Sequence, residues 1–181
     1  LAGLQAGLHL VAGALEAAQA LLATAELAPL DELKRARLER LRGQTVFAHT
    51  RGSDAPPLLL DAARRFEPLD SASARETYVE AFGAAIFAGR ESRAEAALAE
   101  AASTAPSGPR PPRPLDLLLD GLVKRFTKPF GEALPALMQA LHSLAGGDGR
   151  DGDEVRWLRT SLGIAGQALA TELWDDETWH E

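Results

Sequence analysis

The sequence predicts an all-α fold in which antiparallel helix pairs stack into an α-solenoid. Alanine and leucine dominate a composition with only 6% aromatic residues, which favours closely packed helices over sheets. The tripeptide Pro-Leu-Asp occurs three times, at 29–31, 68–70 and 114–116, with spacings of 39 and 46 residues. These spacings are near the period of helix-pair repeats. Because one such pair cannot bury its apolar face alone, we expect neighbouring pairs to share a core.

A second set of matched residues supports the interpretation as a repeat. A glycine, a phenylalanine and an alanine recur at an offset of 40 residues. Small residues at the same places in two helices predict a close approach between helices. The matched residues are Gly43 and Gly83, Phe47 and Phe87, and Ala48 and Ala88.

The first two helical units follow from periodicity and capping residues. Apolar residues recur at helical spacing before Pro29, which predicts a first helix pair divided near Gly13. Asp31 is the expected N-cap of the next helix, because it precedes an apolar stripe over 33–48. The Arg-Gly-Ser stretch at 51–53 ends that helix.

The partner of that helix begins near Asp54, whose carboxylate we expect to cap it. Pro56 and Pro57 fit only in its first turn, where a missing N–H does not matter. Pro68 follows the last apolar residue of this segment and ends the helix.

The third unit repeats the plan. Ser71 or Ser73 is the expected cap, and Glu76 lies three residues after Ser73 in a capping-box pattern. The chain then turns at 89–92. A short partner helix follows over 94–101.

Residues 103–114 are rich in proline and predict a flexible loop that connects two helices at the surface. A proline-rich docking motif is the alternative interpretation of this loop. The apolar segment 115–126 predicts the next helix, which Pro129 bends or ends.

The remaining segments complete one helical-repeat domain over residues 1–181. Residues 133–144 predict a helix with Pro135 in its first turn. A flexible loop rich in glycine and aspartate follows over 145–153, and the last long helix covers 154–173.

The absence of cysteine bears on the cellular compartment in which we expect the protein. Without cysteine the chain has no disulfide framework, no thiol nucleophile and no thiolate metal site, and we place it in the reducing cytoplasm. No apolar run reaches the length of about 20 residues that spans a bilayer, so we expect no membrane partner. Because the chain begins at Leu1 and stops without a tail, we expect it to be a piece of a longer protein.

The formal net charge of −7 argues against direct contact with nucleic acid, which normally requires a basic face. Basic residues do cluster over 34–42, but acidic residues are interleaved with them. This run is therefore interpreted as a solvated helix face.

The sequence contains only incomplete versions of known metal-binding motifs and no catalytic motif that we recognise. The loop 146–151 matches the opening of a calcium β-roll repeat, yet a single copy cannot build that architecture. Glu-x-x-His at 177–180 is half of a di-iron pattern, and the four histidines lack metal-type spacing. The sequence has neither a phosphate-binding loop motif nor a nucleophile elbow. We therefore predict no enzyme activity, no cofactor and no metal site in this chain.

A resemblance rests on three parts of the sequence. They are Leu-Arg-Gly-Gln at 41–44 with the stretch 51–70, Ala-Arg-Glu-Thr-Tyr-Val-Glu-Ala at 74–81 with Phe-Ala-Gly-Arg at 87–90, and Leu-Trp-Asp-Asp-Glu-Thr-Trp-His-Glu at 173–181. From Leu30 to the end, the chain resembles the helical middle region of the large ATP-binding LuxR-family transcriptional regulators. The resemblance implies tetratricopeptide-like helices between an N-terminal ATP-binding module and a C-terminal helix-turn-helix, both outside this chain.

The resemblance also implies a function: relaying signals between those two modules. Its partners would be the neighbouring domains of the parent regulator, a protein or a small effector, and a homo-oligomer is left open. A stand-alone tetratricopeptide-like adaptor for protein–protein interaction is the alternative. A small-molecule-sensing bundle is a third interpretation, which needs an apolar cavity of roughly a few hundred Å3.

One candidate interaction surface follows from the sequence, and we assign no catalytic, cofactor or metal residue. The alternative interpretation is structural: Arg51 and Asp54 shape a turn, and the two tryptophans pack a terminal helix. The candidate residues are Arg51, Asp54, Arg64, Arg65, Arg90, Trp174 and Trp179.

Overall fold

The computed structural model of the chain describes residues 16–17, 20–50, 52–89 and 94–146. Within these residues the regular secondary structure is entirely helical, which confirms the all-α prediction. A short helical segment over 20–26 precedes six longer helices. These are α2 (Glu32–Thr50), α3 (Ala55–Phe66), α4 (Ser71–Ala88), α5 (Ala94–Ser103), α6 (Pro114–Thr127) and α7 (Phe130–Gly146).

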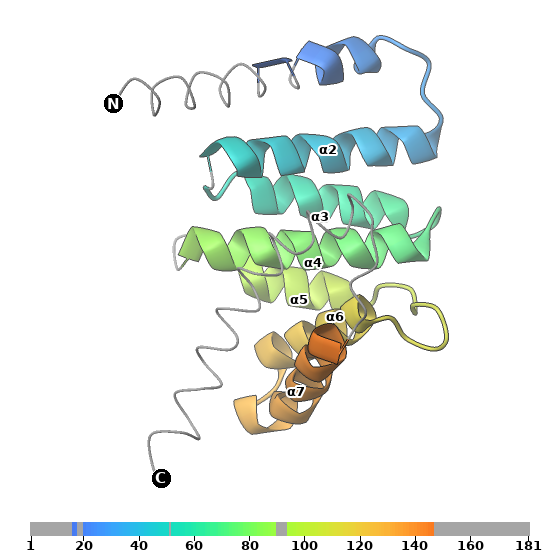
Figure 1. Cartoon of the computed structure of the whole chain (residues 1–181). Helices are drawn as coiled ribbons and strands as arrows, with labels where there is room; N and C mark the ends of the chain where they lie inside the picture. Colours follow the sequence, from blue (N-terminus) through green and yellow to red (C-terminus); the bar gives the residue numbers. More distant parts are fainter. Residues whose placement is uncertain (1–15, 18–19, 51, 90–93, 147–181) are drawn as a thin grey trace.

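Consecutive helices pack against one another along the whole series from α2 to α7, and α4 also contacts α6. Figure 1 shows α2 to α5 as a stack of neighbouring rods in sequence order, with α6 and α7 inclined to that stack. Short connections force adjacent helices to run antiparallel. Among the described helices, none combines the length and the apolar character needed to cross a membrane.

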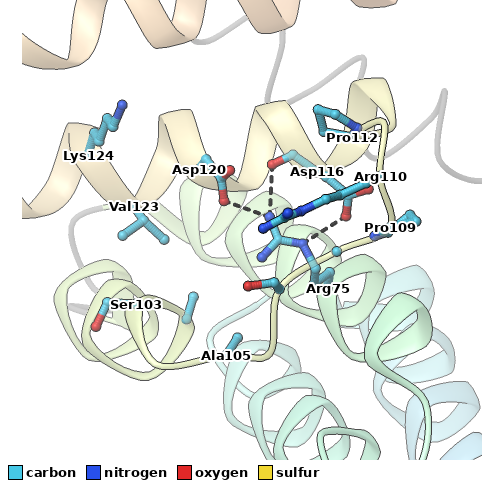
Figure 2. A pocket seen from close by; sticks show the side chains of 13 residues that line it. Arg75, Ser103, Ala105, Pro109, Arg110, Pro112, Asp116, Asp120, Val123 and Lys124 are labelled. Atoms are coloured by element: carbon cyan, nitrogen blue, oxygen red, sulfur yellow. Dashed lines mark hydrogen bonds and ion pairs between the residues drawn. The ribbon is translucent and has the colours of Figure 1, made fainter.

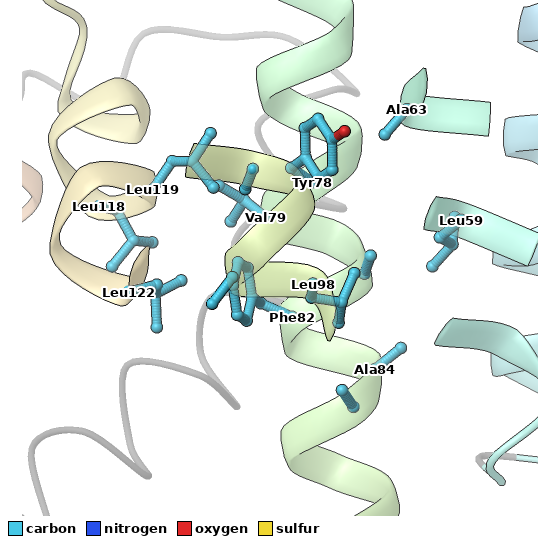
Figure 3. Packing of buried hydrophobic residues seen from close by; sticks show 14 of the residues in the cluster. Leu59, Ala63, Tyr78, Val79, Phe82, Ala84, Leu98, Leu118, Leu119 and Leu122 are labelled. Atoms are coloured by element: carbon cyan, nitrogen blue, oxygen red, sulfur yellow. The ribbon is translucent and has the colours of Figure 1, made fainter. Parts of the chain in front are cut away.

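Helix α4 is the centre of the core and is buried on nearly all sides. Most of its buried residues are apolar, so it must be covered on several faces. Tyr78, Val79 and Phe82 of α4 contribute to one cluster with leucines from α3, α5 and α6 (Figure 3). These leucines are Leu59, Leu98, Leu118, Leu119 and Leu122.

The offset of 40 residues corresponds to contacts between helices. A Cβ atom at Gly43 would lie 2.7 Å from the Leu59 side chain, so α2 and α3 approach closely there, as predicted. The rings of Phe47 and Phe87 pack edge to face with their centroids 5.7 Å apart. The two matched phenylalanines therefore contact each other and link α2 to α4.

The cap of α2 is confirmed, whereas the predicted cap of α3 is wrong in its chemistry. Asp31 Oδ1 accepts a hydrogen bond of 2.8 Å from the backbone N–H of Lys34. Asp54 occupies the N-cap position of α3, but its side chain makes no capping hydrogen bond. Its backbone is already in the helical region, with φ −81° and ψ −24°, whereas a capping residue is typically extended.

The cap of α4 is Asp70, not Ser71 or Ser73 as predicted. The backbone of Asp70 is extended, and Oδ1 accepts from the N–H groups of Ala72 and Ser73 at 3.1 Å. The Ser73 hydroxyl donates to Asp70 Oδ2 at 2.8 Å, so this serine supports the cap from inside the helix.

The third Pro-Leu-Asp copy takes a different place from the first two. In the first two copies the aspartate lies just outside a helix and caps it. In the third, the helix begins at Pro114, so Asp116 lies within its first turn and is buried. The tripeptide therefore marks a helix start each time, but its register relative to that start shifts.

Helix α7 begins at Phe130, three residues earlier than predicted, because Glu132 N–H donates to the Pro129 carbonyl at 3.0 Å and starts the first turn there. Pro135 consequently lies inside the helix, not in its first turn. Pro135 lies at an exposed position of this helix.

Helix α7 also continues through Gly146, two residues into the segment predicted as a loop. The predicted division at Gly13, the rest of the 145–153 loop and the helix over 154–173 lie outside the described residues.

Candidate functional site

Eight polar side chains form one continuous series of hydrogen bonds and ion pairs from α2 across α4 to α6, with one member just before α6. We call this series the charge ladder. Three of its charged residues, Arg75, Glu80 and Asp116, are buried. Charged side chains are rarely buried unless they are paired, as these are. In order, its members are Gln44, Glu80, Arg40, Glu76, Arg113, Asp116, Arg75 and Asp120.

The α2 end of the charge ladder is centred on Glu80, which is 1% exposed. Arg40 Nε donates to both carboxylate oxygens at 3.1 Å, and Arg40 Nη2 donates to Oε1 at 2.5 Å. Gln44 Nε2 adds a bond of 3.1 Å to Oε2. Burial raises the pKa of the Glu80 carboxyl, whereas the bonds from Arg40 and Gln44 act in the opposite direction.

Glu76 joins the two halves of the charge ladder. Its Oε1 accepts from Arg113 Nη1 at 2.5 Å, and its Oε2 lies 3.5 Å from Arg40 Nη1. A single carboxylate on α4 thus pairs with an arginine of α2 and with the arginine that precedes α6. The sharing is unequal, because one contact is short and the other is long.

The α6 end is centred on Asp116, whose side chain is 2% exposed. Oδ1 accepts from Arg75 Nε at 2.7 Å, and Oδ2 accepts from Arg113 Nε at 2.9 Å. Burial alone would raise the pKa of Asp116, but the bonds from Arg113 and Arg75 outweigh it and lower the pKa. The bond to Asp116, together with the bond to Glu76, raises the pKa of Arg113.

Beside this end lies an open pocket of about 530 Å3, which we call the loop pocket (Figure 2). It is lined by the end of α5, the connection between α5 and α6, and one face of α6. Arg75 lies at its centre, bonded to both Asp116 and Asp120. The polar lining residues are Arg75, Ser103, Ser107, Arg110, Asp116, Asp120 and Lys124.

A glycine lets the connection approach the charge ladder. A Cβ atom at Gly108 would lie 2.8 Å from Asp116 Cγ and 3.1 Å from Arg75 Nε. Arg75 Nη1 also donates to the Pro106 carbonyl at 3.5 Å. The connection is therefore fixed against the ladder at these points, while Arg110 and the neighbouring prolines are exposed.

The structure brings together only part of the interaction surface predicted from sequence. Arg64 and Arg65 lie in the last turn of α3 beside a groove of about 580 Å3 between α2 and α3. Arg65 Nε donates to Glu39 Oε2 at 2.8 Å, and this pairing raises the pKa of Arg65.

Asp54 lies apart from these two arginines. It is at the other end of α3, about 15 Å away from Arg64 at 1.5 Å of rise per residue. Asp54 therefore does not lie beside Arg64 and Arg65, and a shared interaction surface that includes all three stays a prediction. Arg51, Arg90, Trp174 and Trp179 lie outside the described residues.

Sequence reasoning missed the charge ladder. One available signal was the repeat offset itself, because Arg40 and Glu80 are 40 residues apart, like Phe47 and Phe87. A second signal was the presence of Glu76 and Glu80 within the apolar segment that became α4. Charged residues that match across a repeat period and lie in a buried helix are candidates for pairing.

The charge ladder links the first helices of three successive pairs, α2, α4 and α6. In the part of the chain that the structure describes, every buried side-chain nitrogen and oxygen has a hydrogen-bond partner. No cluster of three or more histidine, aspartate or glutamate residues there could hold a metal ion.

No protein-family model, curated protein or solved structure matches the chain.

Proposed function

We propose that this chain is a cytoplasmic helical-repeat segment of a LuxR-family transcriptional regulator. It would relay the state of an ATP-binding module to a helix-turn-helix domain, both outside this chain. The segment itself would carry out no catalysis and hold no cofactor. It would make no direct contact with nucleic acid, in keeping with its net charge of −7. Its partners would be the flanking domains, with a protein or small effector biasing the relay.

The observation that carries this proposal is the charge ladder. It connects the first helix of three successive pairs: α2, α4 and α6. Separating Arg40 from Glu80 would leave a buried charge without its partner, which costs about 3–5 kcal/mol in comparable cases. A displacement of one helix pair is therefore expected to move its neighbours or to exchange ion-pair partners.

Glu76 is the point where such an exchange would occur. It binds Arg113 at 2.5 Å and Arg40 at 3.5 Å, so a small shift of α2 or α6 changes which arginine it favours. An element with two alternative arrangements is what a relay needs, because a partner can bias one of them.

The first experiment is to read the gene on both sides of this segment. The relay proposal expects a phosphate-binding loop upstream and a helix-turn-helix downstream in the same reading frame. Start and stop codons close to Leu1 and Glu181 would contradict it. That outcome would support the alternative, a stand-alone adaptor that binds another protein.

The second experiment tests the charge ladder in the whole protein. Glu76→Gln removes the shared carboxylate, and Glu39→Gln is the matched control, because Glu39 pairs with Arg65 outside the ladder. Promoter affinity is measured with and without ATP, on DNA from upstream of the protein's own gene. Glu76→Gln should remove most of the ATP-dependent ratio, which is about 5–150-fold in typical allosteric couplings.

The control should keep that ratio within about twofold, since an exposed pair contributes little. Equal ratios for wild type and Glu76→Gln would show that the charge ladder does not couple the modules. Unfolding measurements on each variant separate loss of coupling from loss of folding.

A further inference from the structure

The loop pocket has an excess of positive charge, although the whole chain is acidic. Three cations line it against two carboxylates. One of these carboxylates, Asp116, is also paired with Arg113, which does not line the pocket. The formal charge of the chain is −7, so a cationic pocket on this surface attracts anions that the rest of the molecule repels.

Two of the cations stand at the rim without a partner. Among the described residues, the side chains of Arg110 and Lys124 have no hydrogen-bond or ion-pair partner, and both residues are exposed. Figure 2 shows the Arg110 side chain extending across the pocket in front of Arg75, with Lys124 further along α6. These two side chains can therefore reach a ligand without breaking an existing bond in the described part of the chain.

The centre of the pocket offers a further donor. A guanidinium group has five N–H donors. In Arg75, Nε and Nη2 donate to Asp116 and Asp120, whereas Nη1 makes only the bond of 3.5 Å to the Pro106 carbonyl. The second N–H of Nη1 has no acceptor within the described residues. The Ser107 hydroxyl also lines the pocket and is exposed.

Five further lining side chains are apolar, and the size of the pocket suits a small molecule. A volume of about 530 Å3 falls within the range of about 300–1,000 Å3 typical of small-molecule sites. The apolar lining accepts a hydrocarbon body beside the charged group. Its side chains are Ala102, Ala105, Pro109, Pro112 and Val123.

We propose that the loop pocket binds a small organic anion. Its carboxylate or phosphate group is held by Arg110, Lys124 and the spare N–H of Arg75, and its apolar body lies against the lining of the connection and α6. Guanidinium groups suit both kinds of oxyanion, because their donors match carboxylate and phosphate geometry. This binding does not depend on the relay function proposed above.

Asp120 is the group that opposes the ligand. Its side chain is 56% exposed, whereas that of Asp116 is 2% exposed. Neutralising Asp120 removes the accessible negative charge from the pocket, and an asparagine oxygen can still accept from Arg75. Asp120→Asn is therefore expected to tighten anion binding, an effect that a damaged fold would not produce.

The probes are benzoate and phenyl phosphate, which share an apolar ring and differ in the anionic group. Benzyl alcohol is the neutral control. Each is titrated into the isotope-labelled whole chain while backbone amide resonances are followed by NMR. Saturable shifts centred on residues 102–124 are expected for an anionic probe and not for benzyl alcohol. The relative affinities of the two anions distinguish a carboxylate site from a phosphate site.

The variant R110Q/K124Q should weaken binding by at least about tenfold, as expected from the loss of two charge-assisted contacts. The variant K34Q/R35Q is the matched control: it removes the same total charge from exposed pairs on α2. This control should leave the affinity within about twofold, and D120N should raise it several-fold.

The proposal is overturned if neither anion saturates, if R110Q/K124Q binds as wild type does, or if K34Q/R35Q weakens binding to the same degree. These outcomes do not bear on the charge ladder as a relay, because the ladder experiment reads promoter affinity and no probe.

Discussion

Asp70 and Asp116 end two copies of the same tripeptide but stabilise the fold in different ways. Asp70 lies outside α4 and satisfies backbone N–H groups at the helix start. Asp116 lies inside α6 and neutralises two arginines in a buried setting. The difference follows from one local choice, whether the proline precedes the helix or begins it.

The capping role of Asp70 predicts a stability difference that depends on pH. Hydrogen bonds from Ser73 and Ala72 hold the pKa of Asp70 below its ordinary value of 3.8. The unfolded state therefore binds the proton more readily, and the stabilisation is present above pH 3.8 and lost as pH falls through the folded pKa. Asp70→Ala should cost about 1 kcal/mol of unfolding free energy at neutral pH.

Urea unfolding across a pH series measures this loss. The difference between wild type and Asp70→Ala should shrink below pH 3.8. Asp70→Asn is the control, because asparagine also caps helices but does not titrate. A loss that stays constant down to the lowest pH would show that the charge of Asp70 contributes nothing.

At the scale of the helix, contacts between α2 and α3 depend on the absence of a side chain. Gly43 faces Leu59, which is fully buried and packed within the core. Glycine lowers the intrinsic stability of a helix interior by about 1 kcal/mol relative to alanine. The close approach of α3 compensates, because it buries Leu59 against the α2 backbone.

Gly43→Ala should therefore destabilise the protein despite its better helix propensity. The new Cβ would lie 2.7 Å from the Leu59 side chain and 3.3 Å from its backbone nitrogen. Overpacking of this kind typically costs about 1–3 kcal/mol. Chemical denaturation gives the difference in unfolding free energy.

The matched control is Gly131→Ala in α7, where the new Cβ would meet no atom within 4 Å apart from its chain neighbours and the backbone of its own helix. This change should stabilise the protein by up to about 1 kcal/mol through helix propensity alone. If both alanine variants were equally stable, the contact at Gly43 would have no energetic role.

At the scale of the whole molecule, α4 holds the fold together. It contacts α3, α5 and α6, and its side chains are buried between them. The ladder carboxylates Glu76 and Glu80 lie on the same helix and connect it to α2 and to the segment before α6. Apolar packing and ion pairing therefore converge on one element.

Hydrogen exchange should reveal this organisation. Among the described helices, we expect the backbone amides of α4 to exchange most slowly. Because α4 is covered by its neighbours, its amides should reach solvent only when the whole domain unfolds, not through local fraying. Leu98→Ala, at a fully buried position of α5, should lower that protection by about 2–5 kcal/mol.

Leu41→Ala is the control, because Leu41 is 49% exposed. It should leave α4 protection nearly unchanged, since exposed positions usually change stability by less than about 0.5 kcal/mol. Faster exchange of α4 than of α2 in the wild type would place the stable centre elsewhere.

Local chemistry determined which segments are helical and roughly where they begin and end. The apolar period, the carboxylate of Asp31 and the prolines at 56–57, 68 and 129 act over one or two turns, so they could be read without the fold. The residues matched at an offset of 40 predicted a repeat and a close approach between helices, but not the contact between Phe47 and Phe87. Errors arose where neighbouring residues competed, as between Asp70 and Ser73 for one cap.

Only the tertiary structure decided the site. Arg75 and Asp116 are 41 residues apart, and whether they meet depends on how α4 packs against α6. The same packing made Glu80 a buried carboxylate and placed Arg110 over the loop pocket. Ion-pair partners and burial are set by distances between helices, which arise from the summed fit of many side chains. No short stretch of sequence contains that information, whereas a helix start is decided within a single turn.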